Sequence, residues 1–176
     1  MPVRLIKQAS ELRARTYKFK IALLSAALIT PPVSAFAEGL QFQCGASSGH
    51  SYYADQGLAA GRGGWSEDGI SDGEIVFRID LDEATASVRF KDATGEWSDA
   101  SDLGGTTAIW HVQTNPVTFG ISVVYSGPTA KTMDAYTLSE IDFERQTAKL
   151  ISTTTRISEM FTNARVLAAE CLVASF

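Results

Sequence analysis

Residues 74–81 read Glu-Ile-Val-Phe-Arg-Ile-Asp-Leu, and this stretch decides which class of fold the chain can adopt. Its apolar side chains recur at every second position, at Ile75, Phe77, Ile79 and Leu81. An apolar period of two is typical of a β-strand with one buried face. The same alternation returns at residues 87–91 after the polar connection at residues 82–85. The two runs therefore predict a β-hairpin.

Short alternating runs continue along the chain, separated by turn residues such as Asn115-Pro116. The further runs that we interpret as strands are residues 41–44, 50–53, 108–112, 117–125, 133–138, 148–156 and 165–171. Residues 157–169 also suit a helix by composition, so that segment has two interpretations. With about eight to nine short strands and no convincing helical period, the sequence predicts an all-β fold, an antiparallel up-and-down barrel or sandwich.

Residues 1–37 have the three parts of a secretory signal peptide in the expected order. Basic residues precede the apolar run at residues 21–29, and Ala35-Phe36-Ala37 is a small-x-small cleavage site. The apolar run is shorter than the roughly 20 residues that cross a bilayer as a helix. We expect cleavage after Ala37, which leaves residues 38–176 as a single exported domain in the periplasm or secreted. The alternative is an uncleaved N-terminal anchor.

The mature chain is acidic. The leader holds six of the 15 Lys and Arg residues and one of the 20 Asp and Glu residues, which leaves nine bases against nineteen acids. Nucleic acids and anionic membrane surfaces require cations that this chain lacks. We therefore predict no nucleic-acid partner, and the mature chain contains no apolar run that indicates a transmembrane segment. The acids are dispersed, as in a solvated surface.

The chain has two cysteines, Cys44 and Cys171, near the two ends of the mature region. Export favours a disulfide, because thiol pairs persist as disulfides outside the cytosol. In an up-and-down barrel the first and last strands pair, which would bring the two residues within bonding distance. Free buried thiols or a reactive thiol are the alternatives. Two cysteines so far apart do not form a structural zinc signature.

Gly45-Ala46-Ser47-Ser48-Gly49 matches the G-x-S-x-G pattern of a serine nucleophile elbow, with His50 beside it. An elbow joins a strand to a helix in a parallel sheet, and its histidine follows later in the chain. Here a tyrosine-rich segment follows, and His111 is the only downstream histidine. We interpret residues 45–49 as a turn and assign no catalytic residue.

Residues 55–73 form the longest stretch without periodicity and are rich in glycine. A long loop with its own aromatic residue is often a binding loop or a packed Ω-loop. The candidate binding residues in and beside this loop are Tyr52, Tyr53, Trp65, Glu67, Asp68 and Asp72. Ordinary core packing of the aromatic residues and a solvated acidic loop are the alternatives. A calcium site at Glu67, Asp68, Asp72 and Glu74 lacks the ladder of an EF-hand, so we predict no metal site and no cofactor.

Five stretches carry a resemblance to known sequences: Phe42–Cys44, Tyr52-Tyr53, Gly64–Gly73, Lys91–Gly95 and Ala169–Cys171. In this order they resemble a group of small uncharacterised exported β-rich proteins of Gram-negative bacteria. The resemblance spans the mature region and implies export, a single domain and an end-to-end cysteine pair. It implies no activity and no catalytic residue.

The sequence favours a non-catalytic exported binding protein whose partner is a small apolar ligand or another protein. For a small ligand, as in lipocalin-like barrels, we expect a continuous interior cavity. For a docking module or an inhibitor of a hydrolase, we expect an exposed Trp65 and a core filled by Phe77, Phe90, Trp110 and Phe119. A hydrolase with carboxylates beside His50 in a cleft is the third hypothesis.

Overall fold

The structure is a computed structural model, and it describes residues 39–92 and 94–176. The predicted signal peptide at residues 1–37, and its cleavage after Ala37, lie outside the described residues. Within the described ranges, no helix is long and apolar enough to cross a membrane.

The described residues form one antiparallel sheet of ten strands. A single turn of 3-10 helix, η1, spans Gly57–Ala59. The strands are β1 (Gly39–Tyr53), β2 (Gly64–Ile70), β3 (Glu74–Asp80), β4 (Thr85–Lys91), β5 (Trp97–Asp99), β6 (Gly105–Thr114), β7 (Val117–Ser126), β8 (Ala130–Asp142), β9 (Thr147–Ser158) and β10 (Thr162–Ser175). Their order in the sheet is β5-β4-β3-β1-β10-β9-β8-β7-β6, and β2 also pairs with β1. The predicted all-β, antiparallel fold is confirmed.

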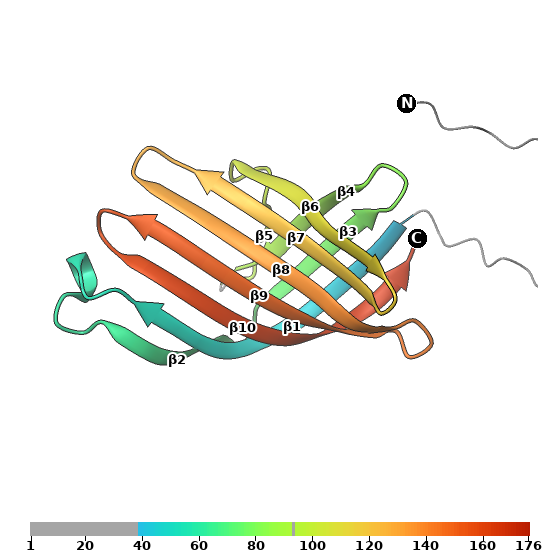
Figure 1. The fold of residues 1–176 in the computed structure, drawn as a ribbon, viewed down its shortest axis with the longest axis horizontal. Helices are drawn as coiled ribbons and strands as arrows, with labels where there is room; N and C mark the ends of the chain where they lie inside the picture. The colour runs from blue at the N-terminus through green and yellow to red at the C-terminus, as the bar shows by residue number, and fades with distance from the viewer. Residues whose placement is uncertain (1–38, 93) are drawn as a thin grey trace, which may run out of the picture. The chain divides into compact units, whose positions relative to one another are not determined.

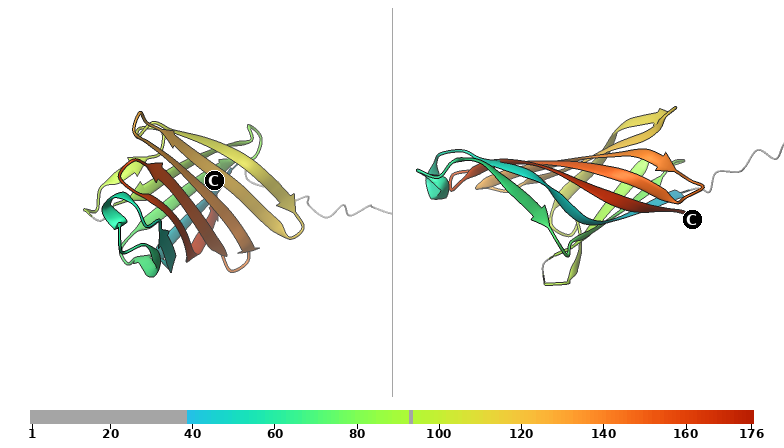
Figure 2. Two further views of the ribbon diagram at one scale, coloured as in Figure 1. Left: turned by 60° about the vertical axis from the view of Figure 1, so that its left-hand side comes forward. Right: turned by 90° about the horizontal axis from the view of Figure 1, so that it is seen from below.

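The sheet curls into a half-barrel whose concave face lies between two arms. One arm contains β6 to β10, and the other contains β3, β4 and β5, which lie behind it in Figure 1. Seen from below, the second arm hangs away from the long strands of the first (Figure 2). The strands that join the two arms are β1 and β10, the first and last of the chain.

β1 and β10 pair along almost their whole length at the centre of the sheet. Cys44 lies directly opposite Cys171 in this ladder, and their sulfur atoms are bonded. The predicted pairing of the first and last strands and the predicted disulfide are both confirmed. Because the bond joins the ends of the domain, it closes a loop of 127 residues.

The hydrophobic core fills the concave face around the disulfide. Its buried side chains alternate along each strand with exposed ones, as period-two patterning requires. They are Leu40, Phe42, Cys44, Phe77, Ile79, Val88, Ala100, Phe119, Ile121, Val123, Tyr136, Leu138, Ala148, Leu150, Ala169, Cys171 and Val173. Phe42 packs edge-on against Phe119, and Phe77 against Tyr136, so aromatic pairs connect the two arms.

The two edges of the sheet, β5 and β6, meet at one point through the turn that follows β5. The amide of Ala100 donates to the carbonyl of Val88 in β4, and the amide of Gly105 in β6 donates to the carbonyl of Ala100. A Cβ at Gly105 would lie 2.7 Å from the Ala100 carbonyl oxygen. Glycine therefore permits this close approach, and the half-barrel is joined at this end of β6.

The turn predicted at residues 45–49 is wrong, because β1 runs through it without interruption. The ladder with β10 shifts register between Cys44 and Ser47, which marks a β-bulge. Pairing with neighbouring strands on both sides satisfies the backbone and overrides the local turn preference of glycine and serine.

Two further expectations are corrected. Residues 55–73 are not one long loop, because Gly64–Ile70 is strand β2, paired with residues 47–53 of β1. The helical alternative for residues 157–169 is wrong, since β9 and β10 form a hairpin there.

Trp110 was expected in the core, but it lies on the outer face with 56% of its surface exposed. A bulge in β6 between Ile109 and His111 places the indole ring over Gly120 of β7. A Cβ at Gly120 would lie 2.5 Å from Cε2 of Trp110, so only glycine accommodates the ring.

Candidate functional site

A groove opens on the concave face where β1 changes partners. Residues 39–44 of β1 pair with β3, whereas residues 47–53 pair with β2. The bulge between Cys44 and Ser47 lies at this change, so the sheet forks there. The groove has a volume of about 670 Å³, within the roughly 300–1,000 Å³ of typical small-molecule sites.

The wall formed by β1, β3 and β4 combines apolar side chains with charged residues at its rim. Gly45 and Ser47 lie at the bulge, and Ile75 of β3 and Phe90 of β4 face each other across their ladder. Ile70 and Leu103 extend the apolar surface toward the open side. Phe90 had been expected to fill the core, but it is half-buried and lines the groove.

The opposite wall, on β7 to β10, is arranged in rows by strand register. Side chains that are direct neighbours across a ladder lie on the same face of the sheet. The innermost row is Leu138, Leu150 and Ala169; the next is Tyr136, Ser152 and Leu167; the third is Asp134, Thr154 and Arg165; and the outermost is Tyr125, Thr132 and Arg156. The wall therefore changes from apolar beside the core to polar and cationic at the ends of the strands.

Asp134 is the half-buried carboxylate of this wall. Burial raises its pKa, whereas hydrogen bonds with Thr154 and Tyr136 and the positive charges of Arg165 and Arg156 act in the opposite direction. Burial and the nearby Asp134 charge also raise the pKa of the Tyr136 phenol. Tyr136 therefore remains a neutral hydrogen-bond donor toward the carboxylate.

Arg156 and Arg165 are the two cations of the wall. Nη2 of Arg165 donates to the Thr154 hydroxyl at 3.4 Å, and Nε of Arg156 donates to the Thr132 hydroxyl at 3.4 Å. The Arg156 guanidinium also lies 5.6 Å from the centre of the Phe161 ring. In the described part of the chain four ion pairs form, and neither arginine belongs to one. Most of their N–H donors are therefore open to another partner.

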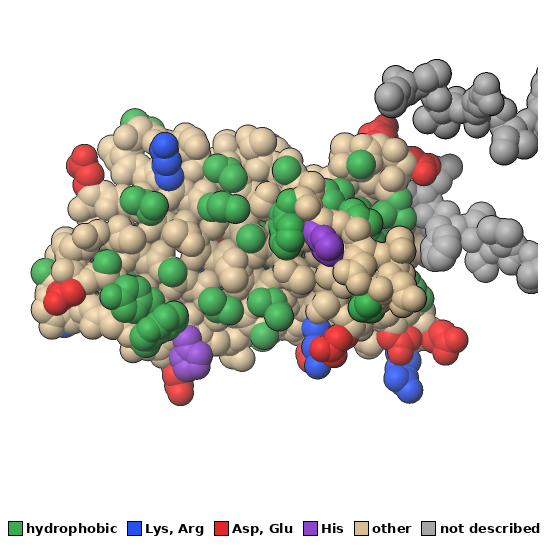
Figure 3. Space-filling model, viewed as in Figure 1, with side chains coloured by type: hydrophobic (Ala, Val, Ile, Leu, Met, Phe, Trp, Pro, Cys, Tyr) green, Lys and Arg blue, Asp and Glu red, His purple; other side chains and the backbone are tan. Residues whose placement is uncertain are grey.

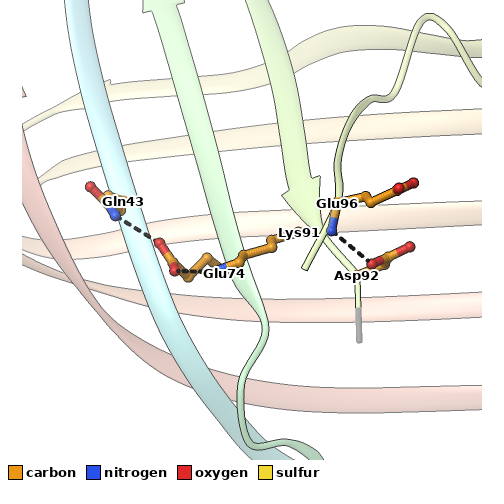
Figure 4. A network of polar contacts seen from close by, with 5 residues as sticks. All are labelled: Gln43, Glu74, Lys91, Asp92 and Glu96. Atoms are coloured by element: carbon orange, nitrogen blue, oxygen red, sulfur yellow. Dashed lines mark hydrogen bonds and ion pairs between the residues drawn. The ribbon is translucent and has the colours of Figure 1, made fainter. Parts of the chain in front are cut away.

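The charged residues at the opposite rim are already engaged (Figure 4). Glu74 accepts hydrogen bonds from Gln43 at 2.8 Å and from Lys91 at 3.2 Å, and these partners lower its pKa. Oδ1 of Asp92 accepts from the hydroxyl of Thr94 and from the backbone amides of Thr94 and Glu96, which lowers the pKa of Asp92. Glu74 and Lys91 pair with each other, and Asp92 is bonded to backbone amides. The charged side chains of the groove that have no such partner are Asp134, Arg156 and Arg165.

A second hollow of about 640 Å³ continues past the cationic end. It shares Leu103, Tyr125, Thr132 and Arg156 with the groove, and Met160 and Phe161 extend it. Arg156 therefore lines both hollows.

The predicted binding residues lie outside the groove, on β1, β2 and the turn after β2. Tyr52 and Trp65 are direct neighbours in the β1–β2 ladder, with ring centres 5.4 Å apart, and they are 40% and 68% exposed. Tyr53 is half-buried, and Glu67 and Asp72 are exposed.

Asp68 accepts hydrogen bonds from the buried Ser51 hydroxyl and from the amide of Gly69. In residues 39–92 and 94–176 no group of three or more His, Cys, Asp or Glu side chains is placed to hold a metal ion. Of the acids considered for calcium, Asp68 accepts from Ser51 and Gly69, whereas Glu74 accepts from Gln43 and Lys91.

His50 is exposed and lies opposite Glu67 in the β1–β2 ladder. It lines neither hollow. The cleft that the hydrolase hypothesis needs beside His50 is therefore neither of these two hollows.

Sequence reasoning missed Asp134, Thr154, Arg156 and Arg165. A signal was present, because in residues 132–136 the polar Thr132 and Asp134 alternate with the apolar Met133 and Ala135. Alternation alone does not say which set is buried, and the hydrophobic effect usually favours the apolar one. In this part of β8, Thr132 and Asp134 face the groove, and Met133 is exposed.

Comparisons of the chain with protein-family models, with curated proteins and with solved structures found no match. The function is therefore argued from the groove and the chemistry of its lining.

Proposed function

We propose that this protein is a non-catalytic binding protein, exported to the periplasm or secreted, which holds a small ligand with an apolar part in the concave groove. The observation that carries the proposal is the groove itself, which begins at the bulge in β1 and has a volume of about 670 Å³. Apolar walls with a few convergent polar groups are characteristic of small-molecule sites.

The chemistry of the lining favours binding over catalysis. Apart from Lys91, which is paired with Glu74, its cations are arginines, which do not release a proton in proteins and therefore serve as fixed charges. Burial raises the pKa of Tyr125 and Tyr136, so these phenols keep their protons. Such groups orient a ligand without exchanging protons with it.

A fluorescence titration with N-phenyl-1-naphthylamine, a neutral apolar probe, tests the proposal. Ser152→Trp places an indole in the middle of the groove, because Ser152 is a lining residue between Tyr136 and Leu167. We expect about a tenfold or greater loss of affinity. Thr153→Trp is the matched control, since Thr153 is the next residue of β9 and is exposed on the outer face. Equal binding by wild type and Ser152→Trp would refute the proposal.

A second candidate function, docking on an envelope protein or inhibition of a hydrolase, is favoured by the exposed Tyr52–Trp65 pair. Aromatic residues of this kind are enriched at the anchor points of protein interfaces. β2 pairs with β1 alone, so its other edge also offers backbone hydrogen-bonding groups.

A pull-down from an envelope extract with wild type, Trp65→Ala and Leu172→Ala tests this second function. Leu172 is a suitable control because it is 65% exposed on β10, away from β2. A partner lost only with Trp65→Ala supports docking, and one retained by all three proteins argues against it.

A further inference from the structure

We propose that the ligand of the groove is an amphipathic molecule with one carboxylate head, which Arg156 and Arg165 bind while its apolar tail lies toward the core. This inference rests on the proposed function and adds the chemical class of the ligand and its orientation. It is argued from the two arginines, the order of the rows and the charge that the wall leaves uncompensated.

The two arginines lie close enough together to bind one head group. Arg165 lies directly opposite Thr154, and Arg156 is two residues further along the same strand, β9. Diagonal neighbours of this kind are separated by about 7–8 Å, within reach of long side chains. The two guanidiniums can therefore converge on one head group, each with a planar set of donors that matches a carboxylate.

The arginine end of the groove carries an excess of positive charge. Asp134 is the only acidic side chain of the described groove lining that accepts no hydrogen bond from a cation or a backbone amide. The positive charges of Arg165 and Arg156 lie near it. Of two acids outside the lining, Asp68 is held by Ser51 and Gly69, and Glu159, which lines the second hollow with Arg156, forms no ion pair among the described residues. The cationic end thus has about one positive charge more than Asp134 can balance. One monoanion restores neutrality, and partial burial strengthens the attraction relative to open water.

The groove lining changes from cationic to apolar along β9. From Arg156 to Leu150 along β9 the lining residues are Arg156, Thr154, Ser152 and Leu150, in that order. At about 3.3 Å per residue this is a path on the order of 20 Å from cation to core. Apolar side chains of the opposite arm, Ile75 and Phe90, line the same hollow. A head at the arginines therefore places a tail against apolar surface on both sides.

Isothermal titration of the mature protein with dodecanoate, dodecanol and dodecyltrimethylammonium tests the proposal. These ligands share one tail and differ in the charge of the head. We expect dodecanoate to bind most tightly and the cation most weakly. We expect Arg156→Gln and Arg165→Gln each to weaken dodecanoate binding about tenfold, while dodecanol binding stays the same. Arg145→Gln is the control, because Arg145 pairs with Asp142 in a turn outside the groove.

Asp134→Asn gives a test with the opposite sign. Removal of this negative charge should tighten dodecanoate binding several-fold and leave dodecanol binding unchanged. The amide has nearly the same shape as the carboxylate, so the fold is preserved.

The outcomes separate the two proposals. If the alcohol binds as tightly as the carboxylate and the arginine variants change neither, the head-group inference is overturned and the proposed function stands. If no ligand or neutral probe binds to the wild-type groove, both are overturned.

Discussion

Asp134 is a carboxylate of the groove whose titration the fold alters. Its pKa is raised by burial, against the opposing effects of Thr154, Arg165, Arg156 and Tyr136. A raised carboxyl pKa means that the folded protein keeps a proton which the unfolded chain has already lost. The contribution of Asp134 to the free energy of unfolding therefore falls as pH rises from its ordinary pKa, about 3.9, to its raised value.

We predict that Asp134→Asn is increasingly more stable than wild type as pH rises through this window, and that the difference is constant above it. Urea denaturation of the two proteins at a series of pH values measures the difference. Glu74 and Asp92, whose pKa values are lowered, lose their contributions on acidification, but they are common to both proteins. A difference that does not vary with pH would contradict the burial of Asp134.

Gly120 and Trp110 give a second test at the scale of single residues. Because a Cβ at Gly120 would lie 2.5 Å from the indole, Gly120→Ala must displace the ring, at a cost of about 1–3 kcal/mol. In a Trp110→Ala background the same substitution should be neutral or stabilising, since alanine is otherwise preferred to glycine within a strand. Equilibrium unfolding of the four proteins forms a double-mutant cycle. Equal costs in both backgrounds would show that the two residues do not interact.

At the scale of elements, the β1–β10 ladder and its disulfide hold the two arms together. In the chain-entropy model, cross-linking residues separated by 127 positions stabilises the folded state by about 5 kcal/mol, and measured values are often smaller. The bond also lies inside the core, where Cys44 is opposite Ile75 of β3 and Cys171 is opposite Ala148 of β9.

We predict that Cys44→Ala/Cys171→Ala lowers the free energy of unfolding by about 2–5 kcal/mol. Urea denaturation of the variant and the oxidised wild type measures the loss. Wild type treated with a reductant should approach the variant. Equal stability of the oxidised and reduced proteins would show that the disulfide does not stabilise the junction between the arms.

The strand faces were only partly predictable. Alternation in residues 74–81 correctly placed Phe77 and Ile79 in the core, because the apolar and polar sets there differ clearly. In β6 and β8 both sets contain apolar residues, so alternation identifies two faces without saying which is buried. The bulge between Ile109 and His111 also changes which alternate residues of β6 face the core. The formation of this bulge depends on pairing with the partner strand.

At the scale of the whole molecule, the half-barrel is filled at one end and hollow at the other. The outer face of β6 to β10 carries scattered hydrophobic side chains, with charges near its periphery (Figure 3). Its exposed apolar residues include Trp110, Val124, Met133, Ile151 and Val166. The polar rows occupy the concave face at the hollow end, which reverses the usual distribution of polarity and places charge where the proposed ligand would lie.

The export prediction also belongs to the whole molecule. When the full chain is expressed in a Gram-negative host, we expect the periplasmic fraction or the medium to contain a protein that begins at Glu38. Alkylation without reductant should modify no cysteine, because Cys44 and Cys171 are bonded. Intact-mass spectrometry measures both features. A protein that retains residues 1–37 in the membrane fraction would favour the uncleaved anchor.

The sequence by itself determined most of the strands and the partner of each cysteine, because period-two patterning is local and two cysteines allow one intramolecular pair. The tertiary structure alone decided where the groove lies. Asp134, Thr154 and Arg165 come from three strands and meet through register, while the bulge after Cys44 forks the sheet in front of them. Register depends on pairing between distant segments, so no local pattern in the chain specifies that these polar side chains face inward together.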